Sequence, residues 1–271
     1  SQLLIKDFNN QIENQIGLYS DLSSTINNIP FDLSFEYNNY LNYINHDPSI
    51  IVDEIDVKIL DITPNFSFDK FGFSLNLGFN LGIEIEPEKS VDVFPIIEVN
   101  KELVDNVVNL SFGIDRDDYR NTLSSLTFEN PYVHTPGIST GVEDSIGYFH
   151  KLETTDIYEC FLNLDNKLSA NEFLTLNIGY GKLLNLHFFD FDQNTSLNRF
   201  NVNYIDTWRF RSKIMYQRKF TNVLSLYLDA QYNWYNEQIP HKTNLVASMS
   251  LPIIFRDKLK FIPSIKYIGE R

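Results

Sequence analysis

Residues 71–85 read FGFSLNLGFNLGIEI, and this stretch indicates the fold class. Its odd positions are all apolar, and its even positions are small or polar. The apolar set is Phe71, Phe73, Leu75, Leu77, Phe79, Leu81, Ile83 and Ile85, and the other set is Gly72, Ser74, Asn76, Gly78, Asn80, Gly82 and Glu84. Because successive side chains of a β-strand point to opposite faces, the segment predicts a strand with one apolar and one polar face.

The same alternation returns at 174–180 and 224–234, and weaker versions of it run along the whole chain. Several of these runs exceed the mean soluble strand of about five or six residues. They reach the roughly nine to eleven tilted residues that cross a bilayer. We predict about a dozen strands, near 8–20, 25–44, 52–66, 71–85, 90–100, 106–118, 155–165, 172–186, 199–217, 223–236, 242–254 and 259–268.

The connections between these strands alternate in length. Short turns are expected at 69–70, 165–170, 218–222 and 255–258, and longer connections at 45–51, 119–154, 186–198 and 237–241, with 100–105 intermediate. Outer-membrane barrels have short periplasmic turns and longer extracellular loops. The pattern therefore predicts an all-β, antiparallel transmembrane β-barrel, with the long connections outside the cell.

The strand near 199–217 indicates which face is wet. Arg209, Arg211 and Lys213 alternate with Trp208 and Phe210. Three cations on one face fit a hydrated lumen better than a dry core. We therefore take these cations as candidate lumen residues. Trp208 and Trp234 are expected at similar heights, in one aromatic girdle.

A mixed-charge cluster ends the strand near 106–118. It comprises Asp115, Arg116, Asp117, Asp118 and Arg120. Its carboxylates Asp115 and Asp117 are candidates for a pore mouth, where charge sets ion preference. The alternative is a solvated rim.

Composition excludes several classes of protein. A net charge of -14 argues against a nucleic-acid partner, since phosphate binding needs clustered Lys and Arg. With 22 Phe and 15 Tyr the chain would bury too much apolar surface to stay unfolded. No apolar run reaches the roughly 20 residues of a spanning helix. The single cysteine, Cys160, alternates with Tyr158 and Leu162, and we expect it to face lipid.

Other polar residues give no catalytic pattern, and we expect neither an enzyme nor a cofactor. The five histidines, His46, His134, His150, His187 and His241, fall in or beside long connections and are expected to be solvated. Asp190, Asp192, Asn194 and Ser196 begin like a calcium loop, but Thr195 replaces its glycine and Asn201 its final glutamate. A flexible polar loop is the simpler interpretation.

The longest connection, 119–154, admits two interpretations. Glu129–Tyr132 could fold into the mouth as a constriction or plug. Alternatively, Phe128 and Tyr132 could pack the loop on its own rim.

Several short stretches resemble one family. They are GIDRDDYRN at 113–121, SLTFENPYV at 125–133, FNVNYID at 200–206, PHKTNLVASMSL at 240–251 and FRDKLKFIPSIKYIGER at 255–271. Together they resemble the barrel portion of TonB-dependent-receptor-like outer-membrane proteins. The resemblance implies uptake or passage of a solute across the bacterial outer membrane. It also implies further strands after Arg271, so that residues 1–271 form one barrel domain incomplete at both ends.

Receptors of this class also carry a plug domain and an energy-coupling box, and neither fits before Phe8. The expected partners are therefore outer-membrane lipid and a separate plug or energy-coupling protein. Two other functions remain open: a non-transporting scaffold or surface-binding barrel that uses its extracellular loops, and a soluble β-sandwich lectin.

Overall fold

The computed structural model describes residues 2–8, 11–44, 54–85, 89–133, 152–191, 200–255 and 259–269. In these residues 13 strands form one antiparallel sheet, in which neighbours in sequence are neighbours in space from β1 to β12, followed by β15. The strands are β1 (Gln2–Phe8), β2 (Gln11–Ile26), β3 (Ile29–Ile44), β4 (Glu54–Lys70), β5 (Phe73–Ile85), β6 (Ser90–Val104), β7 (Val108–Arg120), β8 (Thr154–Ser169), β9 (Glu172–Phe191), β10 (Phe200–Lys219), β11 (Ser225–Tyr235), β12 (Leu245–Ser250), β13 (Ile253–Phe255), β14 (Leu259–Phe261) and β15 (Ser264–Ile268).

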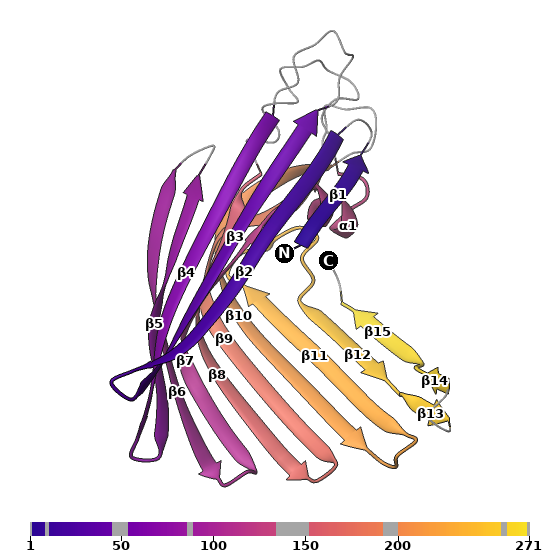
Figure 1. Cartoon of the computed structure of the whole chain (residues 1–271). Coiled ribbons are helices and arrows are strands. Elements are labelled where there is room, and N and C mark those ends of the chain that lie inside the picture. The colour runs from indigo at the N-terminus through magenta and orange to yellow at the C-terminus, as the bar shows by residue number, and fades with distance from the viewer. Residues whose placement is uncertain are drawn as a thin grey trace.

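The sheet is strongly curved, and Figure 1 shows β1–β5 and β9–β12 on different sides of the curve. The predicted all-β antiparallel architecture is confirmed. The pairing order begins at β1 and ends at β15, and no ladder joins these two strands within the described ranges. That the chain is part of a larger barrel stays a prediction.

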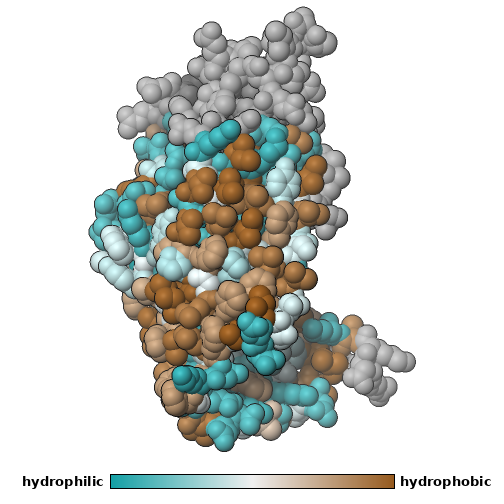
Figure 2. Space-filling view, turned by 60° about the vertical axis from the view of Figure 1, so that its left-hand side comes forward, coloured by the Kyte–Doolittle hydropathy of each residue, from teal (hydrophilic) through white to brown (hydrophobic). Residues whose placement is uncertain are grey.

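The two faces of the sheet differ as the alternation predicts. On β5 the side chains of Phe73 and Phe79 are 44% exposed, and Leu77 is 36% exposed. Between them Asn76 donates to Glu98 of β6, at 3.0 Å from amide nitrogen to carboxylate oxygen. Figure 2 shows apolar side chains gathered in a broad band over this side of the molecule, with hydrophilic side chains at its lower end. An exposed apolar band opposite a hydrogen-bonded polar face suits a strand that separates lipid from water.

The aromatic pair of the predicted girdle lies on the apolar face. Trp208 and Trp234 are both more than 40% exposed. Trp234 pairs with Phe210, two residues from Trp208, so the two indoles are at similar heights. Cys160 is also exposed and pairs with Tyr180 on that face.

Short turns occupy one rim, as expected, although several are displaced from their predicted positions. The connection between β4 and β5 is Phe71–Gly72, with φ of 56° and 73°, and not 69–70. Phe71 therefore belongs to the turn and is not part of the strand. Asn27 and Asn28 also have positive φ and join β2 to β3, so this strand pair turns later than predicted. Two positive-φ residues give the hairpin turn that matches strand twist. The intermediate connection is a short turn at 105–107.

Prolines interrupt the last two predicted strands. The segment 242–254 divides into β12 and β13 at Pro252, and 259–268 divides into β14 and β15 at Pro263. The N–H of Leu251 donates to the carbonyl of Pro263 at 3.0 Å, so the two breaks lie side by side. Proline lacks the N–H that a ladder needs, and β13 and β14 form a separate hairpin beyond the break.

The connection 119–154 contains a helix that the strand analysis missed. Helix α1 (Leu123–Glu129) begins after Thr122, whose hydroxyl accepts from the N–H of Ser125 at 3.1 Å. The Ser125 hydroxyl in turn accepts from the N–H of Thr122 at 3.0 Å, which completes a capping box. Among the described helices none is long and apolar enough to cross a membrane.

Opposite substitutions on β5 test the assignment of the faces. Leu77→Arg places a cation against hydrocarbon and is expected to lower the free energy of unfolding by about 2–4 kcal/mol. Asn76→Arg is expected to cost much less, because the new cation lies beside Glu98 on the polar face. Urea unfolding in lipid vesicles measures both losses, and equal losses would contradict a hydrated inner face.

Candidate functional site

Two buried arginines join the C-terminal half of β7 to its neighbour β8 and to β5, which lies two strands away. The guanidinium of Arg116 donates to Asn80 of β5 at 2.8 Å and to Asp156 of β8 at 2.6 Å. The guanidinium of Arg120 donates to Glu84 of β5 at 3.0 Å. Only 6% of the Arg116 side chain and 5% of the Arg120 side chain are exposed. Removing one partner of a buried ion pair typically costs about 3–5 kcal/mol, because a charge remains without compensation.

A glycine makes room for this network. A Cβ atom on Gly82 of β5 would collide with the guanidinium of Arg116. Gly82 stands between Asn80 and Glu84 on this face of β5. Its lack of a side chain lets the long arginine side chains of β7 reach both residues.

A cavity of about 680 Å³ adjoins the arginines. Carboxylates outnumber cations around it: Asp61, Glu84, Asp92, Asp118, Glu153 and Asp156 against Arg116 and Arg120. A second cavity of about 400 Å³, next to β2 and β3, shares Asp61, Arg116, Asp118 and Arg120 with the first. We call the two together the polar chamber. Its size and lining would accommodate a small polar or cationic solute.

The predicted lumen cations lie on the face of β7–β10 opposite to that of Arg116 and Arg120. Arg209 donates to Glu159 of β8 at 3.1 Å, and Arg211 contacts the same carboxylate. Lys213 pairs with Asp229 of β11 at 3.4 Å. The structure therefore brings the three cations together on one polar strip, where Arg209 and Arg211 share one carboxylate and Lys213 pairs with another.

Strand β9 lies between Glu159 and the two arginines of β10, Arg209 and Arg211, and glycines occupy two of its positions there. A Cβ on Gly179 would collide with the carboxylate itself, whereas a Cβ on Gly181 would collide with the backbone carbonyl of Tyr158. The ion pairs can thus span β9 because Gly179 has no side chain, whereas Gly181 allows a close approach of the β8 backbone.

The predicted pore-mouth carboxylates, Asp115 and Asp117, lie two positions apart on β7 and therefore on the same face of that strand. Asp115 is exposed and lies directly opposite Glu159 in the β7–β8 ladder, on the face of Arg209. Asp117 borders the smaller cavity of the polar chamber. The interpretation of 115–120 as a solvated rim is wrong for Arg116 and Arg120, because β5 and β8 cover them.

Sequence reasoning missed most of the polar chamber. Asp61 and Glu84 lie on the consecutive strands β4 and β5, and Asp156 lies on the distant β8; none of them is among the candidates predicted from the sequence. Two features of the sequence could have indicated the chamber. Glu84 is a charged residue at the end of a polar strand face, and the stretch DRDDYR at 115–120 supplies arginines of opposite charge.

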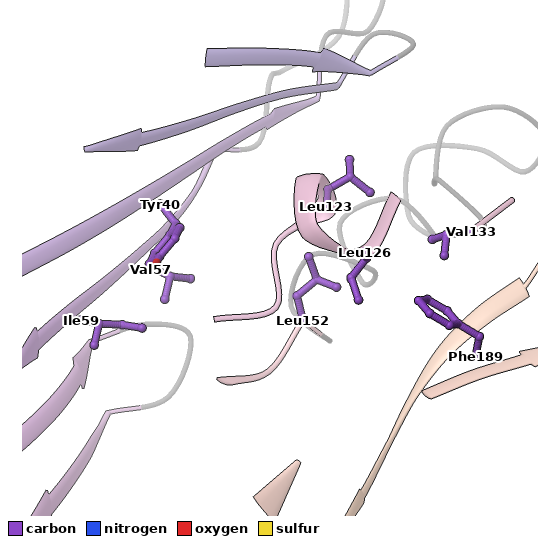
Figure 3. Packing of buried hydrophobic residues seen from close by; sticks show 8 residues of the cluster. All are labelled: Tyr40, Val57, Ile59, Leu123, Leu126, Val133, Leu152 and Phe189. Atoms are coloured by element: carbon purple, nitrogen blue, oxygen red, sulfur yellow. The ribbon is translucent and has the colours of Figure 1, made fainter. Parts of the chain in front are cut away.

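Helix α1 crosses from one wall of the sheet to the other. Leu123 and Leu126 are completely buried. Figure 3 shows them between Tyr40, Val57 and Ile59 of β3 and β4 and Phe189 of β9; Val133 and Leu152 complete the cluster. The carboxylate of Glu13 on β2 accepts the N–H groups of Leu123 and Ser124, each at 2.9 Å. A carboxylate at this end satisfies free N–H groups and complements the helix dipole.

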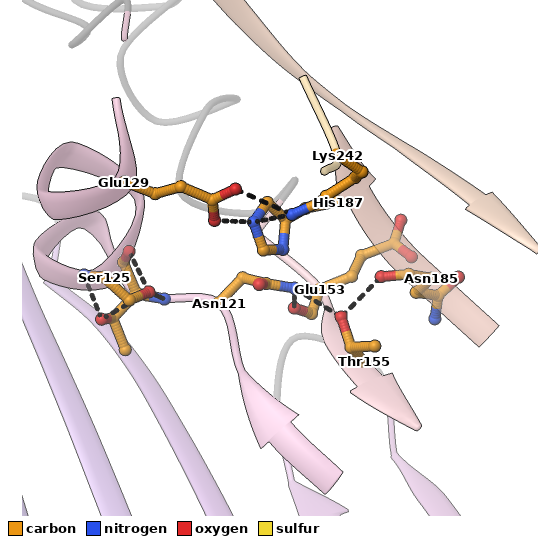
Figure 4. Close-up of polar contacts among 9 residues, drawn as sticks. Asn121, Ser125, Glu129, Glu153, Thr155, Asn185, His187 and Lys242 are labelled. Atoms are coloured by element: carbon orange, nitrogen blue, oxygen red, sulfur yellow. Dashed lines mark hydrogen bonds and ion pairs between the residues drawn. The ribbon is translucent and has the colours of Figure 1, made fainter. Parts of the chain in front are cut away.

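The other end of α1 meets two charged or polar side chains, drawn in Figure 4. Glu129 contacts the Nε2 atom of His187 on β9 at 2.7 Å and the Nζ atom of Lys242 at 2.9 Å. His187 is 6% exposed, so its prediction as a solvated histidine is wrong. His241 is exposed, with its ring 5.2 Å from that of Phe200. His46, His134, His150 and most of the calcium-like segment lie outside the described residues.

The two loop interpretations are thereby distinguished for the described part of the connection. Phe128 is 90% exposed and Tyr132 is 69% exposed, so they do not pack the loop onto its rim. Leu123 and Leu126 make the apolar contacts instead, across the concave side of the sheet.

The contacts with His187 and Lys242 lower the pKa of Glu129. Burial alone would raise the pKa of this carboxyl, but the hydrogen bond from His187 and the charge of Lys242 lower its pKa to about 2. Burial lowers the pKa of Lys242, and the charge of Glu129 opposes that effect.

Comparison of the fold with solved structures gives a consistent group of neighbours. The copper transporter OprC has a TM-score of 0.61 at 10% identity, over 90% of this chain and 41% of that one. The FrpB iron transporter from Neisseria meningitidis has a TM-score of 0.61 at 8% identity, over 95% of this chain and 43% of that one. The siderophore receptor PirA from Pseudomonas aeruginosa has a TM-score of 0.60 at 13% identity, over 95% and 49%.

This chain has a TonB-dependent-receptor-like barrel fold. It spans about two fifths of the length of the first two structures. No family model matches the sequence, and no curated protein matches it. The resemblance inferred from the short stretches is thus confirmed at the level of fold.

A pair of glycine substitutions tests the receptor-like polar strip. Gly179→Ala is expected to push the Glu159 carboxylate away from Arg209 and Arg211 and so to lower stability, whereas it should cost little once Glu159 is itself replaced in Glu159→Ala. Gly181→Ala meets backbone and is expected to cost about 1–3 kcal/mol, as overpacking does. Urea unfolding in vesicles measures the losses with and without Glu159→Ala, and an equal loss for Gly179→Ala in both backgrounds would contradict the strand-skipping geometry.

Acid titration tests the contact at the end of α1. The pKa of Glu129 is about 2 when folded, against an ordinary value of 4.5. Its contribution to stability is therefore complete above the ordinary value and is lost as pH falls through the folded one. The difference in Tm between the wild type and Glu129→Gln is expected to be constant at neutral pH and to vanish towards pH 2 (the folded pKa). Glu237→Gln, an exposed site on the connection that carries Lys242, is the control, and a pH-independent difference at Glu129 would refute the assignment.

Proposed function

We propose that this barrel lets a polar solute cross the bacterial outer membrane beside the polar chamber. The observation that carries the proposal is the chamber itself, whose charged groups lie on the hydrogen-bonded side of β4 and β5, opposite the apolar band. Charged groups within membrane-spanning segments usually mark a substrate or ion pathway.

The neighbouring structures suggest the class of solute to test first. Their titles name copper, iron and siderophores as cargo of those proteins. The excess of carboxylates around the chamber favours a cationic species over an anionic one. Metal ions and positively charged chelates are therefore the first candidates, with outer-membrane lipid and a separate plug or energy-coupling protein as proposed partners.

One observation favours a second function. Helix α1 packs across the concave side of the sheet and fills part of it with apolar side chains. A barrel whose interior is filled serves better as a surface-binding scaffold than as a conduit. In that case the connections on the rim of α1 would carry the binding surface.

Uptake by cells separates the two functions. Cells that carry the full protein in their outer membrane are expected to take up a cationic chelate faster than cells without it. Asp118→Asn removes a chamber carboxylate and is expected to lower that uptake several-fold, with less effect on a neutral solute of equal size. Asp105→Asn, at the exposed turn on the far end of β7, is the matched control. Equal uptake with and without the protein would favour the scaffold.

A further inference from the structure

The two ends of α1 are held by contacts of different kinds. At its start the capping box, the Glu13 carboxylate and the buried Leu123 fix the chain. Just before it, the amide of Asn121 donates to the carbonyl of Glu153 at 2.8 Å and to the hydroxyl of Thr155 at 2.9 Å. We call this end, which is fixed by several hydrogen bonds and by a buried leucine, the anchored end.

The far end depends on Glu129, a side chain that water can reach. Glu129 is 38% exposed on its side chain, although it makes both polar contacts to the opposite wall. The neighbouring Phe128 projects away from the sheet, with 90% of its surface exposed. Beyond the helix, the carbonyl of Tyr132 accepts from the N–H of Phe200 at 3.1 Å, and Val133 is buried. We call the contacts among Glu129, His187 and Lys242 the latch.

In the latch, Glu129 and Lys242 compete for the same ring nitrogen of His187. The Nε2 atom of His187 lies 2.7 Å from Glu129 and 3.0 Å from the Nζ atom of Lys242. A ring nitrogen that carries a proton can donate to the carboxylate, and one that lacks it can accept from the ammonium, but it cannot do both. The Nδ1 atom of the same ring is buried without a hydrogen-bond partner. One of the three contacts is always unfavourable, so the latch is weaker than three hydrogen bonds.

The helix also borders the proposed route. Tyr40 and Ile59, which pack in the α1 cluster, line the smaller cavity of the polar chamber together with Thr122. Leu152, from the same cluster, lines the larger cavity. A displacement of α1 would therefore change the walls of both cavities.

We propose that α1 is a gate beside the polar chamber, hinged at Asn121–Thr122 and held closed by the latch. When the latch opens, the Glu129 end moves away from β9 while the Leu123 end stays on β3 and β4. Opening uncovers Phe189 and enlarges the passage along the concave side. This inference rests on the proposed function, because it gives the regulation of the same route.

Uptake measurements on latch variants test the gate. Lys242→Gln removes the cation of the latch and is expected to raise uptake of the cationic chelate several-fold. Lys242→Arg keeps the charge and is expected to restore closed behaviour. Lys182→Gln makes the same substitution in a longer and more exposed pair with Asp206, at 3.8 Å and away from α1, and is the control with unchanged uptake.

A reducible cross-link tests the same gate in the opposite direction. Glu129→Cys and Lys242→Cys, combined with Cys160→Ser, allow a reducible thiol-reactive linker to join α1 to the facing connection. Cross-linking is expected to suppress uptake below that of the same variant before linking, and reduction is expected to reverse the effect.

Thiol labelling reports movement of α1 without any transport measurement, and so it also tests variants whose folding is altered. Val133→Cys in the Cys160→Ser background places a thiol at a position that is 3% exposed. Its reaction with a maleimide is expected to accelerate when Lys242→Gln is added and not when Lys182→Gln is added. If uptake occurs but neither it nor the labelling responds to the latch, α1 is a fixed element and the gate is refuted. If no variant takes up more chelate than cells without the protein, the proposed function fails, and the gate with it.

Discussion

Backbone hydrogen bonding is the constraint on which the rest of the structure depends. A backbone N–H or carbonyl in hydrocarbon without a partner costs several kcal/mol, and the continuous ladders from β1 to β12 and β15 supply those partners. A ladder of extended strands in turn forces side chains to alternate between faces. The exposed band around Phe79 and the hydrogen-bonded strip around Asn80 are two consequences of that one geometry.

On the polar side, the sheet must satisfy charges with charges from other strands. Glycine is the residue that permits it, since Gly82 leaves room for Arg116 and Gly179 leaves room for Glu159. The result is a mixed-charge lining in two places, the polar chamber and the strip of Arg209 and Arg211, where each arginine pairs with a carboxylate from another strand. Such a lining presents polar groups to a solute without leaving isolated buried charges, which would be costly.

Features that depend on residues close together in the sequence could be predicted from it. The period of two in 71–85 gave the strand and its two faces, and the cations at 209–213 gave a polar strip that the structure contains. Helix α1 could not be found in this way, because seven residues carry little local signal. Its stability comes from partners such as Glu13 and Val57, distant in sequence. The burial of His187 was missed for the same reason, since α1 is what covers it.

The contact between Glu13 and the start of α1 joins residues 110 positions apart. Closing so long a stretch of chain is entropically costly until the intervening strands have paired. The surfaces that receive Leu123 and Leu126 likewise exist only once β3, β4 and β9 are in place. Docking of α1 is therefore a late event in assembly, and a fluorophore on the helix during refolding would report the completion of the sheet around it.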